Sequence, residues 1–411
     1  MCSHQIALVP EWYSLWLISR TAKLPTSVFN IFHSDHRDCT SESHQNLFAR
    51  AFTNVAKLTI GNTAITIDEI ICELIVEGVL GPQTRAENLN YARYFVFSIL
   101  GFQTALYCPS PMDFHGPQPH HLSITEEYGC CNYTHAVLTQ DINVCARESF
   151  SELLMGFGVL LPSKNLCLSE EPSIVRAFHQ QVEVEPRAFN AYALHSLTGL
   201  KFKWTDALSC HLEFNHTTKE VSLFRFPSFC QFYLTKYEPG KERGVLHSCA
   251  TTSRLRCQWA TEEEINHFLL EVILSYRLLF GQTKKSRALF RSVDPFLRWH
   301  GDRRRRVKDP ILSSLCGSRS YLALPLDLRQ AWSLTEKETY NLPQDFPILR
   351  YRIVILQSHL SAAKPRTLTQ LWRDKRNSAD WMTFWAVIVF GSFGSVMAFL
   401  QVILQLAQLL M

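Results

Sequence analysis

Several catalytic signatures are missing from this chain of 411 residues. It has no Gly-x-Ser-x-Gly elbow, no His-Glu-x-x-His pair, no protein-kinase signature and no Gly-x-Gly-x-x-Gly loop after a strand. The segment Gly281 to Ser286 is the nearest approach to a phosphate loop, but it lacks the first glycine of that motif and follows a predicted helix. The sequence therefore predicts no catalytic residue, no metal and no cofactor.

A strong charge, paired cysteines and a leader segment are also missing. The net charge of +4 is too small to predict binding to nucleic acid. The 13 cysteines are odd in number and none has Cys-x2-Cys spacing, which is typical of reduced thiols in the cytosol rather than of a disulfide scaffold. Pro10 and Glu11 break the first apolar run, which no basic leader precedes, so no signal peptide is predicted.

The last part of the sequence, residues 381–411, contains no charged side chain. The 23 residues from Trp381 to Ile403 include eleven Phe, Val, Ile or Leu. As a helix they rise about 34 Å, which matches a hydrocarbon core about 30 Å thick. A buried core helix is the alternative, although such helices are usually shorter and have a polar face. The pattern predicts a transmembrane helix over 381–403 and a short uncharged tail over 404–411.

Basic residues before this helix indicate its orientation. Arg373, Lys375 and Arg376 precede it, and no charged residue follows in the sequence. Because positive charge is retained on the cytosolic side, we expect a single-pass, tail-anchored protein with its N-terminal body in the cytosol and the lipid bilayer as a partner. Trp381 and Trp385 stand one turn apart at the start of the helix and are expected at the cytosolic membrane interface.

Small residues recur along the predicted membrane helix. Gly391 and Ser395 are four residues apart, as are Gly394 and Ala398. Small residues at this spacing allow a second helix to approach closely. The pattern therefore predicts that the helix pairs with another helix, which would make the protein a homo-oligomer. The alternative is that these residues are only tolerated there.

The remainder of the chain is predicted to be mainly α-helical with a small antiparallel β element, an α+β body. Three pairs fit capping boxes: Thr66 with Glu69, Ser149 with Glu152 and Thr261 with Glu264. Thr84 with Glu87 has the same pattern and is expected to open a helix over 86–107. Alternating segments at 211–214 and 220–226 predict a hairpin.

The order of these signals divides the sequence into regions. Four regions are expected before the membrane helix and its tail: a helical region, a loop, a mostly helical region that holds the hairpin near 211–226, and basic juxtamembrane helices. Their boundaries are 1–108, 109–147, 148–345 and 346–380.

The loop region is rich in cysteine and histidine, the residue types that bind zinc. Neither Cys-x2-Cys nor His-x3-His spacing occurs, and adjacent residues of this kind cannot easily point at one tetrahedral ion. We therefore expect a plain loop. The residues concerned are Cys108, His115, His120, His121, Cys130, Cys131 and His135.

A second basic cluster lies further from the membrane helix, at Arg303, Arg304, Arg305 and Arg306. A solvated loop is the simpler interpretation. If the body is tethered to a cytosolic leaflet, the cluster is also suited to contact anionic lipid headgroups, where each basic residue contributes about 1 kcal/mol.

Some segments resemble a known family. They are Trp204 to Phe229, Glu262 to Phe290, Leu371 to Asp374 and Trp381 to Trp385. Together they resemble a family of uncharacterised proteins from filamentous fungi whose members share a hydrophobic C-terminal helix. The resemblance covers about residues 200–403 and implies a fungal membrane protein, but it carries no catalytic residues.

Three functions are consistent with these features. The favoured one is a membrane-anchored scaffold or regulatory module whose cytosolic body binds protein partners. The first alternative is a membrane-bound enzyme with a site assembled from distant residues. The second is an oligomeric channel-like protein, in which Gln401 and Gln405 of bundled helices would line the path.

Overall fold

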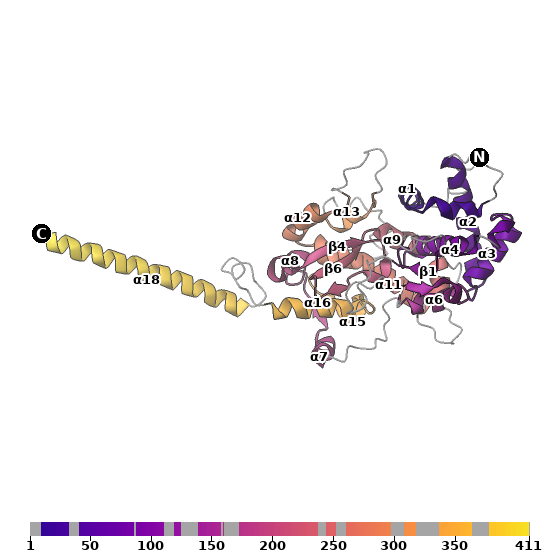
Figure 1. The fold of residues 1–411 in the computed structure, drawn as a ribbon. Coiled ribbons are helices and arrows are strands. Elements are labelled where there is room, and N and C mark those ends of the chain that lie inside the picture. Colours follow the sequence, from indigo (N-terminus) through magenta and orange to yellow (C-terminus); the bar gives the residue numbers. More distant parts are fainter. Residues whose placement is uncertain are drawn as a thin grey trace.

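The fold was obtained as a computed structural model. It describes residues 10–32, 41–85, 88–110, 119–124, 139–157, 159, 172–236, 244–251, 260–296, 308–317, 337–363 and 378–410. The described residues are mainly helical, with three small sheets, as the sequence predicts. In Figure 1 the N-terminal and C-terminal parts of the body lie side by side, and one long helix extends away from them.

The N-terminal part packs around one buried helix, α4. From Ala92 to Thr104 all residues of α4 are buried, so neighbouring helices cover its whole circumference. Thr66 and Glu69 form the expected capping box at the start of α3. The helices of this part are α1 (Glu11–Thr21), η2 (Thr26–Ile31), α2 (Ser41–Gly61), α3 (Ile67–Val76), η3 (Pro82–Arg85) and α4 (Leu89–Thr104).

The expected capping of α4 by Thr84 is wrong. The Thr84 hydroxyl donates to the carbonyl oxygen of Ile31 at 3.0 Å, and α4 begins only at Leu89. Thr84 itself lies in η3, and Asn88 occupies the N-cap position of α4.

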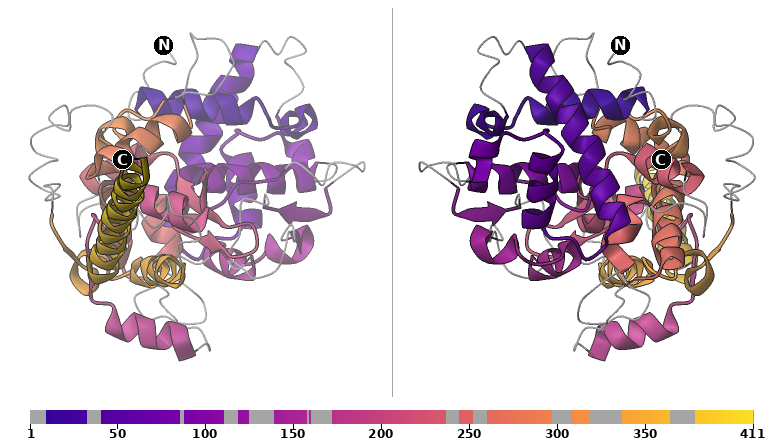
Figure 2. Two further views of the ribbon diagram at one scale, coloured as in Figure 1. Left: turned by 90° about the vertical axis from the view of Figure 1, so that its left-hand side faces the viewer. Right: turned by 90° about the vertical axis from the view of Figure 1, so that its right-hand side faces the viewer.

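The region predicted as a loop contains short regular elements. Strands β1 and β2 pair antiparallel, with Leu122 opposite Gln140. At the start of α6, the Glu152 carboxylate accepts the backbone N–H of Ser149 at 3.0 Å, and the two residues form the expected capping box. Helix α7 lies at the lower edge in both views of Figure 2, and none of its residues is buried. The elements of the predicted loop region are β1 (His121–Ser123), β2 (Thr139–Asp141) and α5 (Ile142–Cys145). Those that follow it are α6 (Phe150–Gly156), α7 (Pro172–Gln180) and β3 (Glu183–Val184).

The central sheet contains the predicted hairpin and one strand that the sequence did not reveal. Strand β5 pairs antiparallel with β6, as expected. Strand β4 adds to the other side of β6 in parallel, with Trp204 opposite Leu223. The elements are α8 (Ala191–Thr198), β4 (Lys201–Thr205), η4 (Leu208–Cys210), β5 (Phe214–Asn215), β6 (Glu220–Phe224) and α9 (Pro227–Lys236).

The second buried helix, α11, begins at the predicted Thr261 capping box and continues into a π-helical turn that ends at Gly281. A side chain at Gly281 would place its Cβ 2.8 Å from the carbonyl oxygen of Leu315, so only glycine allows this close approach. The elements of this part are α10 (Val245–Thr251), α11 (Glu262–Tyr276), η5 (Arg277–Gly281), α12 (Lys284–Val293), α13 (Leu312–Leu315), β7 (Tyr340–Asn341), α15 (Leu342–Asp345) and α16 (Arg350–Ala362).

One continuous hydrophobic core joins these elements. It includes residues from Tyr13 in α1 to Leu360 in α16. The helix that extends from the body is α18 (Ser378–Leu410), so the helical conformation continues through residues 404–410, which the sequence assigned to a tail. The divisions between the predicted regions stay predictions.

Candidate functional site

Helix α18 presents a long apolar surface. The segment Met382–Gln408 is long and apolar enough to cross a membrane, and none of its most apolar window is buried. Large hydrophobic side chains such as Phe390 and Phe399 are 75% and 67% exposed. The interpretation of this stretch as a buried core helix is therefore wrong. A contiguous apolar surface of this size marks a contact with lipid or with another protein.

The small residues of α18 leave its backbone accessible. Cβ atoms added at Gly391 or Gly394 would meet no atom within 4 Å. The Ser395 hydroxyl donates to the Gly391 carbonyl oxygen at 2.9 Å, so its hydrogen is bonded within the helix. With Ala398 these residues share one side of the helix, because they recur every three or four positions. Their role in helix pairing stays a prediction.

Most residues predicted at the membrane interface lie outside the described residues. These are Arg373, Lys375 and Arg376, together with the cluster Arg303 to Arg306. Trp381 lies in α18, and Trp385 follows it as a half-buried residue with its ring 6.2 Å from the ring of Phe384.

Only three members of the Cys/His set are among the described residues: Cys108, His120 and His121. His115, Cys130, Cys131 and His135 lie outside them. Within the described part of the chain, no group of three or more His, Cys, Asp or Glu side chains is placed to hold a metal ion.

Helix α16, the last described helix before α18, is bonded to the body through two arginines of its first turn. Arg350 donates to the carbonyl oxygen of Phe178 at 2.5 Å. Arg352 donates to the carbonyl oxygens of Ser209 and His211 at 2.7 and 2.5 Å. These charge-assisted bonds hold α16 against α7 and the segment before the hairpin.

His211 and Ser275 form a buried pair whose geometry differs from that of a nucleophile and its base. His211 Nδ1 accepts the backbone N–H of Phe224 at 3.2 Å, so the ring proton is on Nε2, which lies 2.7 Å from Ser275 Oγ. The serine hydroxyl donates to the carbonyl oxygen of Val272 at 2.7 Å. Burial, aided by the charge of Arg352, lowers the pKa of His211 to about 3. The histidine therefore donates to the serine, the reverse of what nucleophile activation requires.

Two buried carboxylates bond to backbone N–H groups. Glu271 of α11 accepts from Ile348 at 3.0 Å and from Leu349 at 2.6 Å, just before α16 begins. Burial raises the pKa of Glu271 to about 8, against these hydrogen bonds, which lower it. Asp309 accepts the backbone N–H of Ser228 at 2.9 Å, and burial raises the pKa of Asp309 to about 6. Both groups join segments that are far apart in the sequence.

Asp206 is a buried carboxylate that pairs with two arginines, and sequence reasoning did not find it. It is 2% exposed and forms ion pairs with Arg20 of α1 and with Arg225, which follows β6. Its Oδ2 also accepts Nε1–H of Trp16 at 3.3 Å. The sequence offered no signal for this site, because Asp206 and Trp16 are 190 residues apart and no motif links them.

Comparison of the chain with protein-family models, with curated proteins and with solved structures finds no match. The resemblance to a fungal family therefore rests on the residues of segments 204–229, 262–290, 371–374 and 381–385 alone.

Proposed function

We propose that this protein is anchored in a membrane by Met382–Gln408 and that its body acts as a scaffold or regulatory module at the cytosolic face. The observation that carries the proposal is that this segment has no charged side chain and that none of its most apolar window is buried. In water such a surface would cause aggregation, whereas the transfer of these apolar side chains into the hydrocarbon core of a bilayer is favourable. The resemblance to the fungal family supports the same proposal, because its members share an apolar helix at this place.

The connection between body and helix is short. Helix α16 is bonded to the body through Arg350 and Arg352, and residues 364–377 separate Ala363 from α18. Even fully extended, this segment spans only about 50 Å, because each residue adds about 3.5 Å. Anchoring by α18 would therefore keep the body next to the membrane surface, which suits a module that gathers partners there.

Charge supports the cytosolic orientation. Arg373, Lys375 and Arg376 precede the helix within the range over which basic residues determine orientation. Contacts of these residues, and of the cluster Arg303 to Arg306, with anionic headgroups would contribute about 1 kcal/mol per residue.

The anchor is tested by carbonate extraction and protease protection of isolated membranes. The full chain with an N-terminal tag is expected to resist extraction, and added protease should digest the tag. A V389K/V396K variant should become extractable, since each lysine near the helix centre costs about 3 kcal/mol. V389L/V396L is the matched control and should stay in the membrane. A protected tag would place the body on the other side of the membrane, and an extractable full chain would refute the anchor.

The role as an interaction module needs a separate experiment. Proximity labelling from the anchored chain should enrich a defined set of proteins that is absent when V389K/V396K carries the same label. A labelling pattern equal to that of an unrelated membrane-anchored control protein would count against a scaffold.

A further inference from the structure

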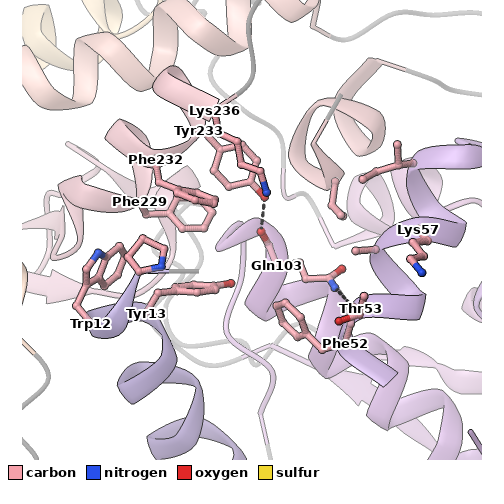
Figure 3. Close-up of a pocket in the computed structure, with 14 residues that line it drawn as sticks. Trp12, Tyr13, Phe52, Thr53, Lys57, Gln103, Phe229, Phe232, Tyr233 and Lys236 are labelled. Atoms are coloured by element: carbon pink, nitrogen blue, oxygen red, sulfur yellow. Dashed lines mark hydrogen bonds between the residues drawn. The ribbon is translucent and has the colours of Figure 1, made fainter. Parts of the chain in front are cut away.

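A pocket of about 240 Å³ opens between the N-terminal helices and α9 (Figure 3). Its aromatic walls are Trp12 of α1, Phe52 of α2, and Phe229 and Phe232 of α9. An apolar cavity of about 150 Å³ holds one benzene molecule, so this pocket has room for a flat molecule of about two fused rings. Aromatic walls favour a flat ring, because offset stacking and edge contacts add to the burial of apolar area.

One polar atom of the pocket, the amide oxygen of Gln103, has no hydrogen-bond partner among the described residues. Gln103, at the end of α4, is 3% exposed and lies between Tyr233 and Phe52 in Figure 3. Its Nε2 donates to the Phe52 carbonyl oxygen at 2.6 Å, which fixes the orientation of the amide, because the flipped group would place two acceptors together. Its Oε1 is buried and accepts no hydrogen bond from the described residues.

The neighbouring hydroxyl groups cannot supply that bond. The Tyr13 hydroxyl donates to the carbonyl oxygen of Phe102 at 2.7 Å, and the Tyr233 hydroxyl donates to that of Gln103 at 2.8 Å. Both hydroxyl hydrogens are therefore already used. A buried acceptor without a donor is costly, so the Gln103 amide oxygen favours a molecule that brings an N–H or O–H group into the pocket.

The charges at the pocket have one sign. Lys57 of α2 and Lys236 of α9 are exposed residues of its lining, and no acidic residue is among the described residues that line it. Lys236 Nζ lies 5.2 Å from the centre of the Phe232 ring, so the ammonium group is held next to an aromatic wall. The open side of the pocket therefore attracts an anion.

We propose that this pocket binds a small aromatic carboxylic acid with a ring N–H or O–H group. The ring lies between the aromatic walls, the ring donor bonds to Gln103 Oε1, and the carboxylate faces Lys57 and Lys236. This ligand site is independent of the membrane anchor, because none of its lining residues belongs to α18.

Binding is tested with the full chain in nanodiscs of zwitterionic lipid, using indole-3-acetate as the probe and calorimetric titration as the readout. Saturable binding is expected. Two analogues separate the contributions of the ring N–H and the carboxylate to binding by the parent chain. 1-Methylindole-3-acetate lacks the ring N–H, and 3-methylindole lacks the carboxylate. Each should bind about tenfold more weakly, which corresponds to the loss of one hydrogen bond or one charged contact.

Substitutions in the pocket test which residues cause these losses of affinity. Q103L should weaken indole-3-acetate about tenfold and abolish the difference between it and its N-methyl analogue. K57M/K236M should remove the preference for the carboxylate. K203M, at an exposed lysine of β4 outside the pocket, is the matched control and should bind as the parent chain does.

Three results would overturn the proposal. The first is the absence of saturable binding by indole-3-acetate. The second is equal binding of the N-methyl analogue and the probe to the parent chain, a comparison that does not depend on whether any variant folds. The third is tighter binding of decanoate than of the probe with no effect of Q103L, which would make the pocket an acyl-chain site.

Discussion

Replacement of Asp206 by asparagine is expected to destabilise the protein strongly. The substitution preserves the shape of the side chain and an acceptor for Trp16, but it removes the charge that pairs with Arg20 and Arg225. Asp206 itself is almost fully buried, whereas the side chains of the two arginines stay partly exposed. The change therefore isolates the electrostatic part of the site.

The magnitude follows from the burial of the three groups. Removal of one partner from a buried ion pair costs about 3–5 kcal/mol. The side chains of Arg20 and Arg225 stay 21% and 22% exposed and can be partly hydrated, so the lower end of this range is expected. A loss of about 3 kcal/mol is a large fraction of the 5–15 kcal/mol that stabilises a typical domain.

Urea unfolding of the full chain in detergent micelles, followed by tryptophan fluorescence, measures this loss. Glu183→Gln is the matched control, because Glu183 is an exposed carboxylate and should change the free energy of unfolding by less than about 0.5 kcal/mol. Hydrogen exchange should also rise in α1, which Asp206 holds through Arg20 and Trp16.

A double-mutant cycle with Arg20→Met separates the ion pair from the rest of the site. A coupling energy of at least about 1 kcal/mol between the two positions is expected. If D206N unfolds at the same urea concentration as E183Q, or if the coupling energy is zero, the ion pairs do not stabilise this junction and the reasoning fails.

Three further predictions concern α11, α16 and α18. Glu271→Gln should remove the contribution of this residue to the pH dependence of the free energy of unfolding. Burial raises the pKa of Glu271 from 4.5 to about 8, so the folded state binds more protons than the unfolded state between these pH values. In the parent chain the free energy of unfolding should therefore fall by up to about 1.4 kcal/mol per pH unit as the pH rises through this range. Urea titrations between pH 6.5 and 8, above the range in which Asp309 and His211 change the stability, should show a smaller slope for the variant, and an unchanged slope would contradict the assignment. Arg352→Met should cost about 2 kcal/mol and increase hydrogen exchange in α16, because two charge-assisted bonds to the body are lost; equal exchange in both proteins would argue that α16 is held by packing alone. Gly394→Ile should weaken energy transfer between labelled α18 helices in liposomes, whereas Val396→Ile on the opposite side should not, and equal transfer in both would exclude pairing through the small residues.

Several features of this protein could be predicted from the sequence because their causes are local. The uncharged run after Asp380 predicts a membrane helix by composition alone, and the structure has one exposed apolar helix there. The capping boxes at Thr66 and Thr261 depend on residues three positions apart, and both form. The hairpin around 215–219 needs only alternation and a turn, and its strands pair as expected.

Other features depend on the tertiary structure. Thr84 does not cap α4, and its hydroxyl donates to a carbonyl oxygen 53 residues away. Strand β4 joins β6 in parallel although its own sequence gives no such signal. The candidate ligand pocket likewise gathers residues from α1, α2, α4, α9 and α10.

The sequence by itself thus determined the apolar helix, the helical class of the body and the start of several helices. The tertiary structure alone decided which partners a buried charge meets, as where Asp206 meets Arg20 and Arg225, and which polar atom is left without a partner, as at Gln103. The physical reason is the range of the forces involved. Capping and hydrophobic periodicity act within a few residues, whereas the pairing of a buried polar group is settled only when distant segments pack together and exclude water.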